Sequence, residues 1–202
     1  MELTNNIWLN LNKVISSSID DKINFRRLFN NVCILYGPSL VKLHNDCINL
    51  DKLNILCRED QYSHLKDFFV YKNNFIEIQT FDTHVFIKKI NRVKNISFSV
   101  RIINNPIKSI SSFVSLKIEE IYYNGKLVIH NNMKEFITME ENYNGTFSDS
   151  IIKRMKKYIL FGYKFNIDDN GCKIILNSGN RGSYLKRLKY MFSFNIRNKD
   201  VQ

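Results

Sequence analysis

Proline, glycine and paired cysteines are scarce in this sequence of 202 residues. Two prolines and seven glycines leave no Pro-rich or Gly-rich linker between domains. Its four cysteines include no Cys-x-x-Cys pair, and its four histidines stand too far apart for the usual zinc spacing. We therefore expect a single domain with reduced thiols and without a metal site.

Long apolar runs are missing as well. Charged residues interrupt the most apolar stretches well before the roughly 20 residues that span a bilayer. The first ten residues lack the basic flank and the unbroken apolar stretch of a secretory signal. These absences argue against membrane and secreted proteins, and they predict an intracellular protein of the cytoplasm with no membrane partner.

Positive charge is abundant and unevenly distributed. The 30 Lys and Arg against 19 Asp and Glu give a formal net charge of +11. Residues 151–202 contribute +9 of this, as twelve basic residues less three aspartates. Such a basic protein predicts an anionic partner, most commonly nucleic acid. A compositional explanation stays open, because AT-rich coding sequences enrich Lys and Asn without any selection for binding.

Basic residues of the C-terminal quarter follow a helical pattern. Residues 148–162 predict an amphipathic helix that ends at Gly162, with basic side chains opposite its apolar face. A short strand and a second basic helix at 183–192 are expected to follow. The residues predicted to bind nucleic acid are Lys153, Arg154, Lys156, Lys157, Arg181, Lys186, Arg187 and Lys189.

Strands and helices alternate in the preceding part of the chain. Two helices are expected before a buried strand at 32–36, which the Gly37-Pro38 turn ends. A helix, a buried strand at 53–57 and another helix follow, and three strand-like runs predict a meander between 75 and 103. The pattern indicates an α+β fold, a mixed sheet flanked by helices. Its parts are expected at 1–31 (helical extension), 32–147 (α+β core) and 148–202 (basic helices).

A hairpin is predicted around Asn124-Gly125, between strand-like runs at 113–123 and 126–130. Asn and Gly both accept the positive φ angles of a type I′ turn. Tyr122 and Tyr123 precede this turn. Because side chains alternate along a strand, we expect one tyrosine buried and one exposed, unless the pair forms a platform for stacked bases.

The segment around Gly37 resembles a known family. "LYGPSLVKLH" and "LNILCREDQYSHLKDFF" are similar to the strand-glycine-helix and the second strand of nucleotidyltransferase-like proteins, including poly(A) polymerase-type enzymes, of large AT-rich DNA viruses. "ISFSVRII" resembles their third catalytic strand, and "KRMKKYILFGYKF" resembles a basic helix of viral members. The resemblance covers residues 32–167. It implies a palm-type nucleotidyltransferase-like fold and a nucleotide-binding turn at Gly37, Pro38 and Ser39.

The positions that match the family's catalytic carboxylates hold other residues here. The resemblance places the paired carboxylates at Lys52 and Asn54 and the third at Ser99. None of these side chains supplies the negative charge that holds two divalent ions, and the Lys52 ammonium repels Mg²⁺. The family's hydroxyl after the glycine falls on Pro38, with Ser39 one residue late. We therefore expect a pseudoenzyme that needs no cofactor.

Three functions are open at this stage. The first is an inactive nucleotidyltransferase-fold module that binds RNA, another nucleic acid, or a viral or host protein, in the host cytoplasm or the virion. The second is an active Mg²⁺-dependent nucleotidyltransferase in which Asp46, Asp51 or Glu59 replaces the lost carboxylates. A one-residue slip turns a side chain to the opposite face of a strand, so Asp51 would need a bulge. The third is a basic structural component of an organellar ribosome or a virion.

Overall fold

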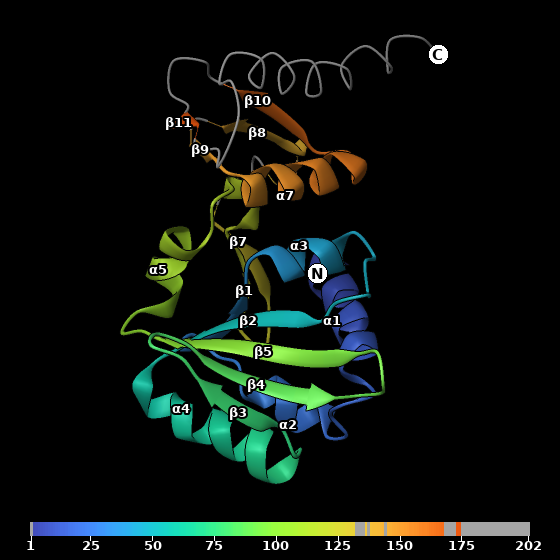
Figure 1. Ribbon diagram of the computed structural model, residues 1–202, viewed down its shortest axis with the longest axis vertical. Helices are drawn as coiled ribbons and strands as arrows, with labels where there is room; N and C mark the ends of the chain where they lie inside the picture. Colours follow the sequence, from blue (N-terminus) through green and yellow to red (C-terminus); the bar gives the residue numbers. More distant parts are fainter. Residues whose placement is uncertain (1, 132–135, 137, 144, 168–172, 175–202) are drawn as a thin grey trace. The chain divides into compact units, whose positions relative to one another are not determined.

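The computed structural model describes residues 2–131, 136, 138–143, 145–167 and 173–174. These residues belong to two compact units, one made of 1–114 with 119–131 and the other of 115–118 with 132–202. The predicted α+β class, a mixed sheet flanked by helices, is confirmed (Figure 1). The domain boundaries expected at residues 32 and 148 stay predictions.

A seven-stranded sheet forms the first unit, in the order β3-β4-β5-β2-β1-β6-β7 (Figure 1). β2 and β5 run parallel, whereas the other neighbours run antiparallel. The predicted meander is confirmed as β3-β4-β5. The strands are β1 (Cys33–Tyr36), β2 (Lys52–Cys57), β3 (Ile76–Gln79), β4 (His84–Lys89), β5 (Asn95–Ile102), β6 (Ile121–Tyr123) and β7 (Val128–His130).

One face of this sheet is covered by aromatic packing against helices. The Phe98 ring on β5 lies 5.8 Å from Phe25 and 4.5 Å from Phe69, measured between centroids. Phe25 belongs to α2, and Phe69 belongs to the π-helical segment that continues α4. The helices of this unit are α1 (Glu2–Ile15), α2 (Lys22–Arg27), α3 (Pro38–His44), α4 (Glu59–Lys66), the π-helix η1 (Asp67–Lys72) and α5 (Pro106–Phe113).

The opposite face, here called the front face, is the one that carries Tyr36. α5 covers one end of it, where Ile110 packs against a buried cluster that includes Tyr36 and Tyr122. At the other end, Ile76 and Ile78 of β3 are 70% and 49% exposed. Because paired residues of neighbouring strands point to the same side of a sheet, the register extends the front face from Tyr36 through β2, β5 and β4 to β3.

The strand predicted over residues 113–123 is wrong over residues 113–120. Phe113 ends α5, residues Lys117–Glu119 form a 3₁₀ turn, and β6 begins only at Ile121. The start of α5 has a recognisable sequence signal, because Pro106 occupies the first turn and the Asn105 side chain accepts a hydrogen bond from the Lys108 backbone N–H. The error covers residues 113–120, where the β-branched Val114 and Ile118 favour a strand.

The β6–β7 hairpin is present, but its turn differs from the expectation. The Asn124 backbone N–H donates to the Leu127 carbonyl at 3.2 Å, so Gly125 and Lys126 occupy the centre of the turn. Gly125 has φ 84°, whereas Asn124 and Lys126 have negative φ, so the turn is not type I′.

Both tyrosines before this turn are buried. Tyr122 is 6% exposed and packs beneath α5, and Tyr123 is 1% exposed and stacks on Trp8 of α1 at 5.8 Å between centroids. The expectation of one buried and one exposed tyrosine is therefore wrong. Helices cover the sheet on both faces at this position, so alternation of side chains exposes neither ring.

The described residues of the second unit form one long helix and two pairs of strands. Its elements are β8 (Glu140–Tyr143), β9 (Thr146–Phe147), α7 (Asp149–Leu160), β10 (Lys164–Ile167) and β11 (Lys173–Ile174), with β10 parallel to β8 and β11 parallel to β9. The Ser148 hydroxyl caps α7 by accepting a hydrogen bond from the Ile151 N–H at 3.4 Å, and Gly162 (φ 96°) follows its end. The helix predicted over 148–162 is confirmed, and the one at 183–192 lies outside the described residues.

Two further predictions concern cysteines and membranes. Cys33, Cys47 and Cys57 are free thiols, as expected, and Cys172 lies outside the described residues. Burial raises the pKa of the Cys57 thiol to about 12, so this thiol stays protonated near neutral pH. In the part of the chain that the structure describes, no helix is both long enough and apolar enough to cross a membrane.

Candidate functional site

The parallel pair β2–β5 brings the three positions expected to have lost carboxylates to one place. Asn54 is aligned with Ser99, and Lys52 is aligned with Ser97. Aligned residues on neighbouring strands lie about 4.8 Å apart and point to the same side. Lys52, Asn54 and Ser99 therefore share the front face, where Lys52 is exposed, Asn54 is half-buried and Ser99 is buried.

The glycine turn lies beside this group. Tyr36, the last residue of β1, is aligned with Asn54, and Gly37 begins the connection to α3. Gly37 adopts φ 82° and ψ −150°, a backbone conformation that residues other than glycine adopt only with strain. Pro38 stands in the first turn of α3, where its missing N–H leaves no hydrogen bond unmade.

Ser39 has a structural hydrogen bond in this turn. Its hydroxyl donates to the Lys52 carbonyl oxygen at 2.8 Å, and the residue is 5% exposed. The bond fastens the start of α3 to the start of β2. The turn at Gly37, Pro38 and Ser39 is thus formed next to Lys52 and Asn54, and its binding of a nucleotide stays a prediction.

The carboxylates considered as replacements each have another position or partner. Asp51 precedes Lys52, so alternation directs its side chain away from the front face, and its carbonyl oxygen accepts from the Ser97 N–H at 2.8 Å. The Asp46 carboxylate accepts from the Asn10 amide at 2.8 Å. Glu59 begins α4, beyond the end of β2 that is opposite Lys52.

A Mg²⁺ ion does not fit the side chains at this site. Mg²⁺ binds carboxylate oxygens in near-octahedral geometry, whereas Lys52 offers an ammonium, Asn54 an amide and Ser99 a hydroxyl. Among the residues that the structure describes, no group of three or more His, Cys, Asp or Glu could hold a metal ion. An anion suits these donors better, since the ammonium, the amide N–H and the hydroxyl all donate hydrogen bonds.

The basic helix α7 presents part of the predicted nucleic-acid surface. Lys153 and Lys156 are exposed, and Lys157 is half-buried. Arg154 is half-buried, and its Nη2 donates to the Ser115 hydroxyl at 3.1 Å. The buried face of the helix contains Ile151, Ile152, Met155 and Tyr158, and Ile159 is half-buried. Outside the described residues lie the other predicted contacts, Arg181, Lys186, Arg187 and Lys189.

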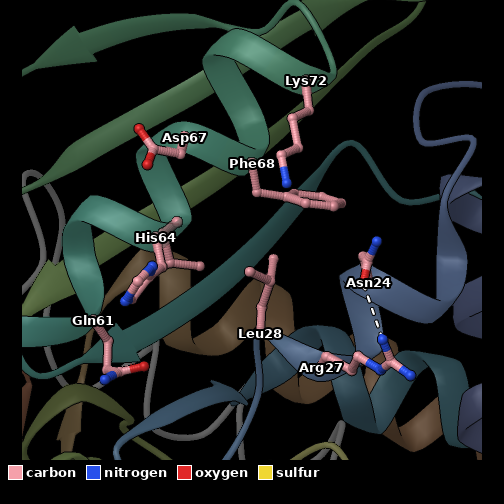
Figure 2. A pocket seen from close by; sticks show the side chains of 9 residues that line it. Asn24, Arg27, Leu28, Gln61, His64, Asp67, Phe68 and Lys72 are labelled. Carbon is pink, nitrogen blue, oxygen red and sulfur yellow. Dashed lines mark hydrogen bonds between the residues drawn. The ribbon is translucent and has the colours of Figure 1, made fainter.

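A pocket of about 350 Å³ lies between α2 and the continuous helix α4–η1 (Figure 2). Its apolar lining consists of Leu28, Leu65 and Phe68. No sequence pattern indicates this pocket, because two helices far apart in the chain supply ordinary surface residues. The polar lining consists of Asn24, Arg27, Gln61, His64, Asp67 and Lys72, so basic groups outnumber the one carboxylate.

A hydrogen-bonded cluster joins α4 to the hairpin of β3 and β4. The Tyr62 hydroxyl donates to the Glu77 carboxylate and lies 2.7 Å from His84 Nδ1, and the Lys66 ammonium lies 2.9 Å from the same carboxylate. Burial favours the protonated form of Glu77, but the hydrogen bonds from Tyr62, Lys66 and His84 outweigh it and lower the pKa to about 2. Sequence reasoning missed this cluster, since it depends on the β3–β4 register.

Comparisons with known proteins give a likeness at the level of the fold. No family model matches the chain, and no curated protein is significantly similar to it. A CCA-adding enzyme with CTP is 14% identical with a TM-score of 0.48, over 78% of this chain and 43% of that chain. A Thermotoga maritima CCA-adding enzyme complexed with tRNA is 15% identical with a TM-score of 0.47, over 78% of this chain and 42% of that chain. An apo form of a CCA-adding enzyme is 13% identical with a TM-score of 0.48, over 92% of this chain and 46% of that chain. The chain thus spans less than half the length of these enzymes.

Proposed function

We propose that this protein is a nucleotidyltransferase-fold module that binds RNA and does not transfer nucleotides. One observation carries the proposal. The β2–β5 register gathers Lys52, Asn54 and Ser99 beside the Gly37 turn, where the sequence resemblance expects carboxylates. A site with an ammonium in place of a carboxylate attracts phosphate and repels a divalent cation, so the change inverts the charge of the preferred ligand.

Charge elsewhere in the chain supports RNA as the partner. The net charge of +11 raises the rate and the affinity of encounter with any polyanion. On α7, the buried apolar face forces Lys153, Lys156 and Lys157 toward the other side of the helix. Viral origin, a location in the host cytoplasm or the virion, and a protein partner instead of RNA stay predictions.

Binding of a fluorescently labelled single-stranded RNA, followed by anisotropy over a salt series, tests this proposal. Affinity should fall with salt, with a log-log slope of about −0.7 for each contacted phosphate. Combining Lys153→Glu, Lys156→Glu and Lys157→Glu removes three contacts on α7, so the slope should become about 2 less steep. The substitutions leave the buried face of α7 intact, and Glu is a good helix former.

A matched control separates the α7 surface from net charge alone. Combining Lys89→Glu, Arg92→Glu and Lys94→Glu changes the net charge equally, but near the β4–β5 turn. This control should retain most of the affinity. Equal loss in both variants would show that only net charge matters, and unchanged binding in both would turn the proposal toward a protein partner.

A further inference from the structure

Three polar side chains form a row across the front face of the sheet. Tyr36 at the end of β1 is aligned with Asn54 on β2, and Asn54 is aligned with Ser99 on β5. Neighbouring strands lie about 4.8 Å apart, so the backbones of Tyr36 and Ser99 are about 10 Å apart. Aligned residues point to the same side of a sheet, so these three side chains, here called the polar row, lie next to one another.

The polar row contains hydrogen-bonding groups that the protein itself does not use. Tyr36 is 6% exposed, Ser99 is 8% exposed and Asn54 is half-buried. Within the described part of the chain, neither the two hydroxyls nor the amide makes a hydrogen bond to another protein group. The Ser97 hydroxyl, on the same face, instead donates to the Asp51 carbonyl at 3.0 Å. Because unpaired polar groups are unfavourable away from water, the row favours a ligand that completes their hydrogen bonds.

The chemistry of the polar row suits a hydroxyl group of a ligand. Its side chains are two hydroxyls and one amide, and each of these groups both donates and accepts hydrogen bonds. A ligand hydroxyl also does both, whereas a phosphate only accepts. All three side chains are neutral, so the row itself has no charge that favours an anion.

A cation suited to phosphate lies beside the row. Lys52 precedes Asn54 by two residues on β2, so their backbones lie about 7 Å apart on the same face. Its exposed ammonium has no ion pair with the described residues. Arg101, the basic residue of β5, is already paired with the Asp82 carboxylate at 3.3 Å. Between these two strands, Lys52 is therefore the basic residue available to a phosphate.

We propose that the polar row binds the 2′-hydroxyl of an RNA nucleotide whose phosphate contacts Lys52, and that it thereby selects RNA over DNA. Within a strand the 3′-oxygen is esterified, so the 2′-hydroxyl is the sugar group that both donates and accepts, and DNA lacks it. Val85, aligned with Ser99 and half-buried, offers an apolar surface to the carbons of the sugar. This inference rests on the proposed function and adds a selectivity to it.

Positive charge cannot supply this selectivity. Single strands of RNA and DNA have the same phosphates, and phosphate contacts do not read the rest of the nucleotide. The net charge of +11 and the basic side chains of α7 should therefore bind both kinds of strand alike. A preference for RNA that depends on the polar row is thus separate from the electrostatic contribution.

Anisotropy titrations with labelled oligouridylate and oligodeoxyuridylate, at one salt concentration, test the proposal. These strands have the same base and differ in the 2′-hydroxyl. The full wild-type chain should bind the RNA about 5–10-fold more tightly, the effect of one or two neutral hydrogen bonds. The double variant Asn54→Ala, Ser99→Ala should bind both strands equally, with its affinity for DNA unchanged. Comparing the two strands within each variant cancels any general effect of the sugar on the strand.

Two single variants locate the effect. Ser97→Ala is the matched control, because it removes a hydroxyl of the same strand and face that is already bonded to the Asp51 carbonyl, so the preference for RNA should stay. Lys52→Gln should weaken the binding of both strands by the same factor, because it removes a phosphate contact. Thermal unfolding, together with the unchanged affinity for DNA, shows that the double variant is folded.

The outcomes separate this inference from the proposed function. Equal affinity of the wild type for both strands overturns the inference and leaves the proposed RNA binding in place. A preference for RNA that persists in the double variant, or that Ser97→Ala abolishes as well, also overturns it. If the wild type binds neither strand, the proposed function fails and this inference fails with it.

Discussion

Lys52 is the residue that most changes what the front face can bind. It is aligned with Ser97 and lies on the same side as Asn54 and Ser99. A carboxylate at this position would attract a cation, whereas an ammonium favours the oxygens of a phosphate. Asn54 and Ser99 supply neutral donors, so neither side chain neutralises the positive charge of Lys52.

If the three positions converge as described, carboxylates introduced there should create a metal site. The combination of Lys52→Asp, Asn54→Asp and Ser99→Asp should bind Mn²⁺, which the wild type should not do. Bound Mn²⁺ at about 100 times the dissociation constant should stabilise this variant by about 2.7 kcal/mol, measured by thermal unfolding with and without the ion. A control with Asn95→Asp in place of Ser99→Asp, at the start of β5, should gain much less. Equal gains would refute the convergence.

Two glycines should respond differently to alanine. At Gly37 an added Cβ meets Val114 at 3.5 Å, an ordinary contact, so Gly37→Ala costs only the backbone strain, about 1–3 kcal/mol. At Gly125 an added Cβ would lie 2.3 Å from the Phe29 carbonyl oxygen, so Gly125→Ala adds a clash and should cost more. Urea unfolding measures both losses. A stability loss at Gly37 equal to or greater than that at Gly125 is the opposite of what we expect.

At the scale of elements, the Glu77 cluster fastens α4 to the β3–β4 hairpin. The carboxylate on β3 has hydrogen bonds from Tyr62 and Lys66 on α4 and from His84 on β4. Three elements are thus held by one ionised group. The same cluster keeps the only charge of β3 occupied, which leaves the outer edge of the strand neutral.

Acid should release this attachment. The pKa of Glu77 is lowered from 4.5 to about 2, so its contribution to stability is present above pH 4.5 and is lost as the pH falls through 2. We expect Glu77→Gln to reduce the free energy of unfolding by about 2 kcal/mol at pH 7, a value discounted for the exposure of Lys66. This difference should shrink steadily between pH 5 and pH 2 in denaturant titrations. A constant difference over that range is the outcome that speaks against it.

Elements that follow from a local hydrophobic pattern could be predicted from the sequence, whereas features that depend on tertiary contacts could not. β1 is a continuous apolar run because both its faces are buried, the last three residues of β2 are apolar and buried as well, and α7 has a regular apolar stripe. The strand predicted over residues 113–123 begins only at Ile121, because Phe113 ends α5 and residues Lys117–Glu119 form a 3₁₀ turn. The burial of both Tyr122 and Tyr123 likewise depends on helices that cover opposite faces of the sheet.

The candidate site was predictable only in part. The resemblance named Lys52, Asn54 and Ser99, and the β2–β5 register then placed them side by side. That register could not be derived from the sequence, because about forty residues separate the two strands and a parallel pair has no turn to fix its alignment. The Ser39 hydrogen bond to the Lys52 carbonyl and the pocket between α2 and α4 also depend on contacts between distant segments.

At the scale of the whole molecule, the proposed function is RNA binding through positive charge, without a catalytic ion. The proposal assigns phosphate contacts to donors on the front face and to basic side chains on α7. RNA binding should therefore need no divalent metal. It should also proceed without any chemical change to the RNA end.

One measurement tests this claim most directly: RNA affinity of the full chain at fixed ionic strength, in EDTA and in Mg²⁺, with labelled nucleotides present to detect incorporation. We expect the same dissociation constant in both solutions and no labelled product. Binding that requires Mg²⁺, or incorporation of label that Asp51→Ala abolishes, would show instead that this fold retains an active nucleotidyltransferase site.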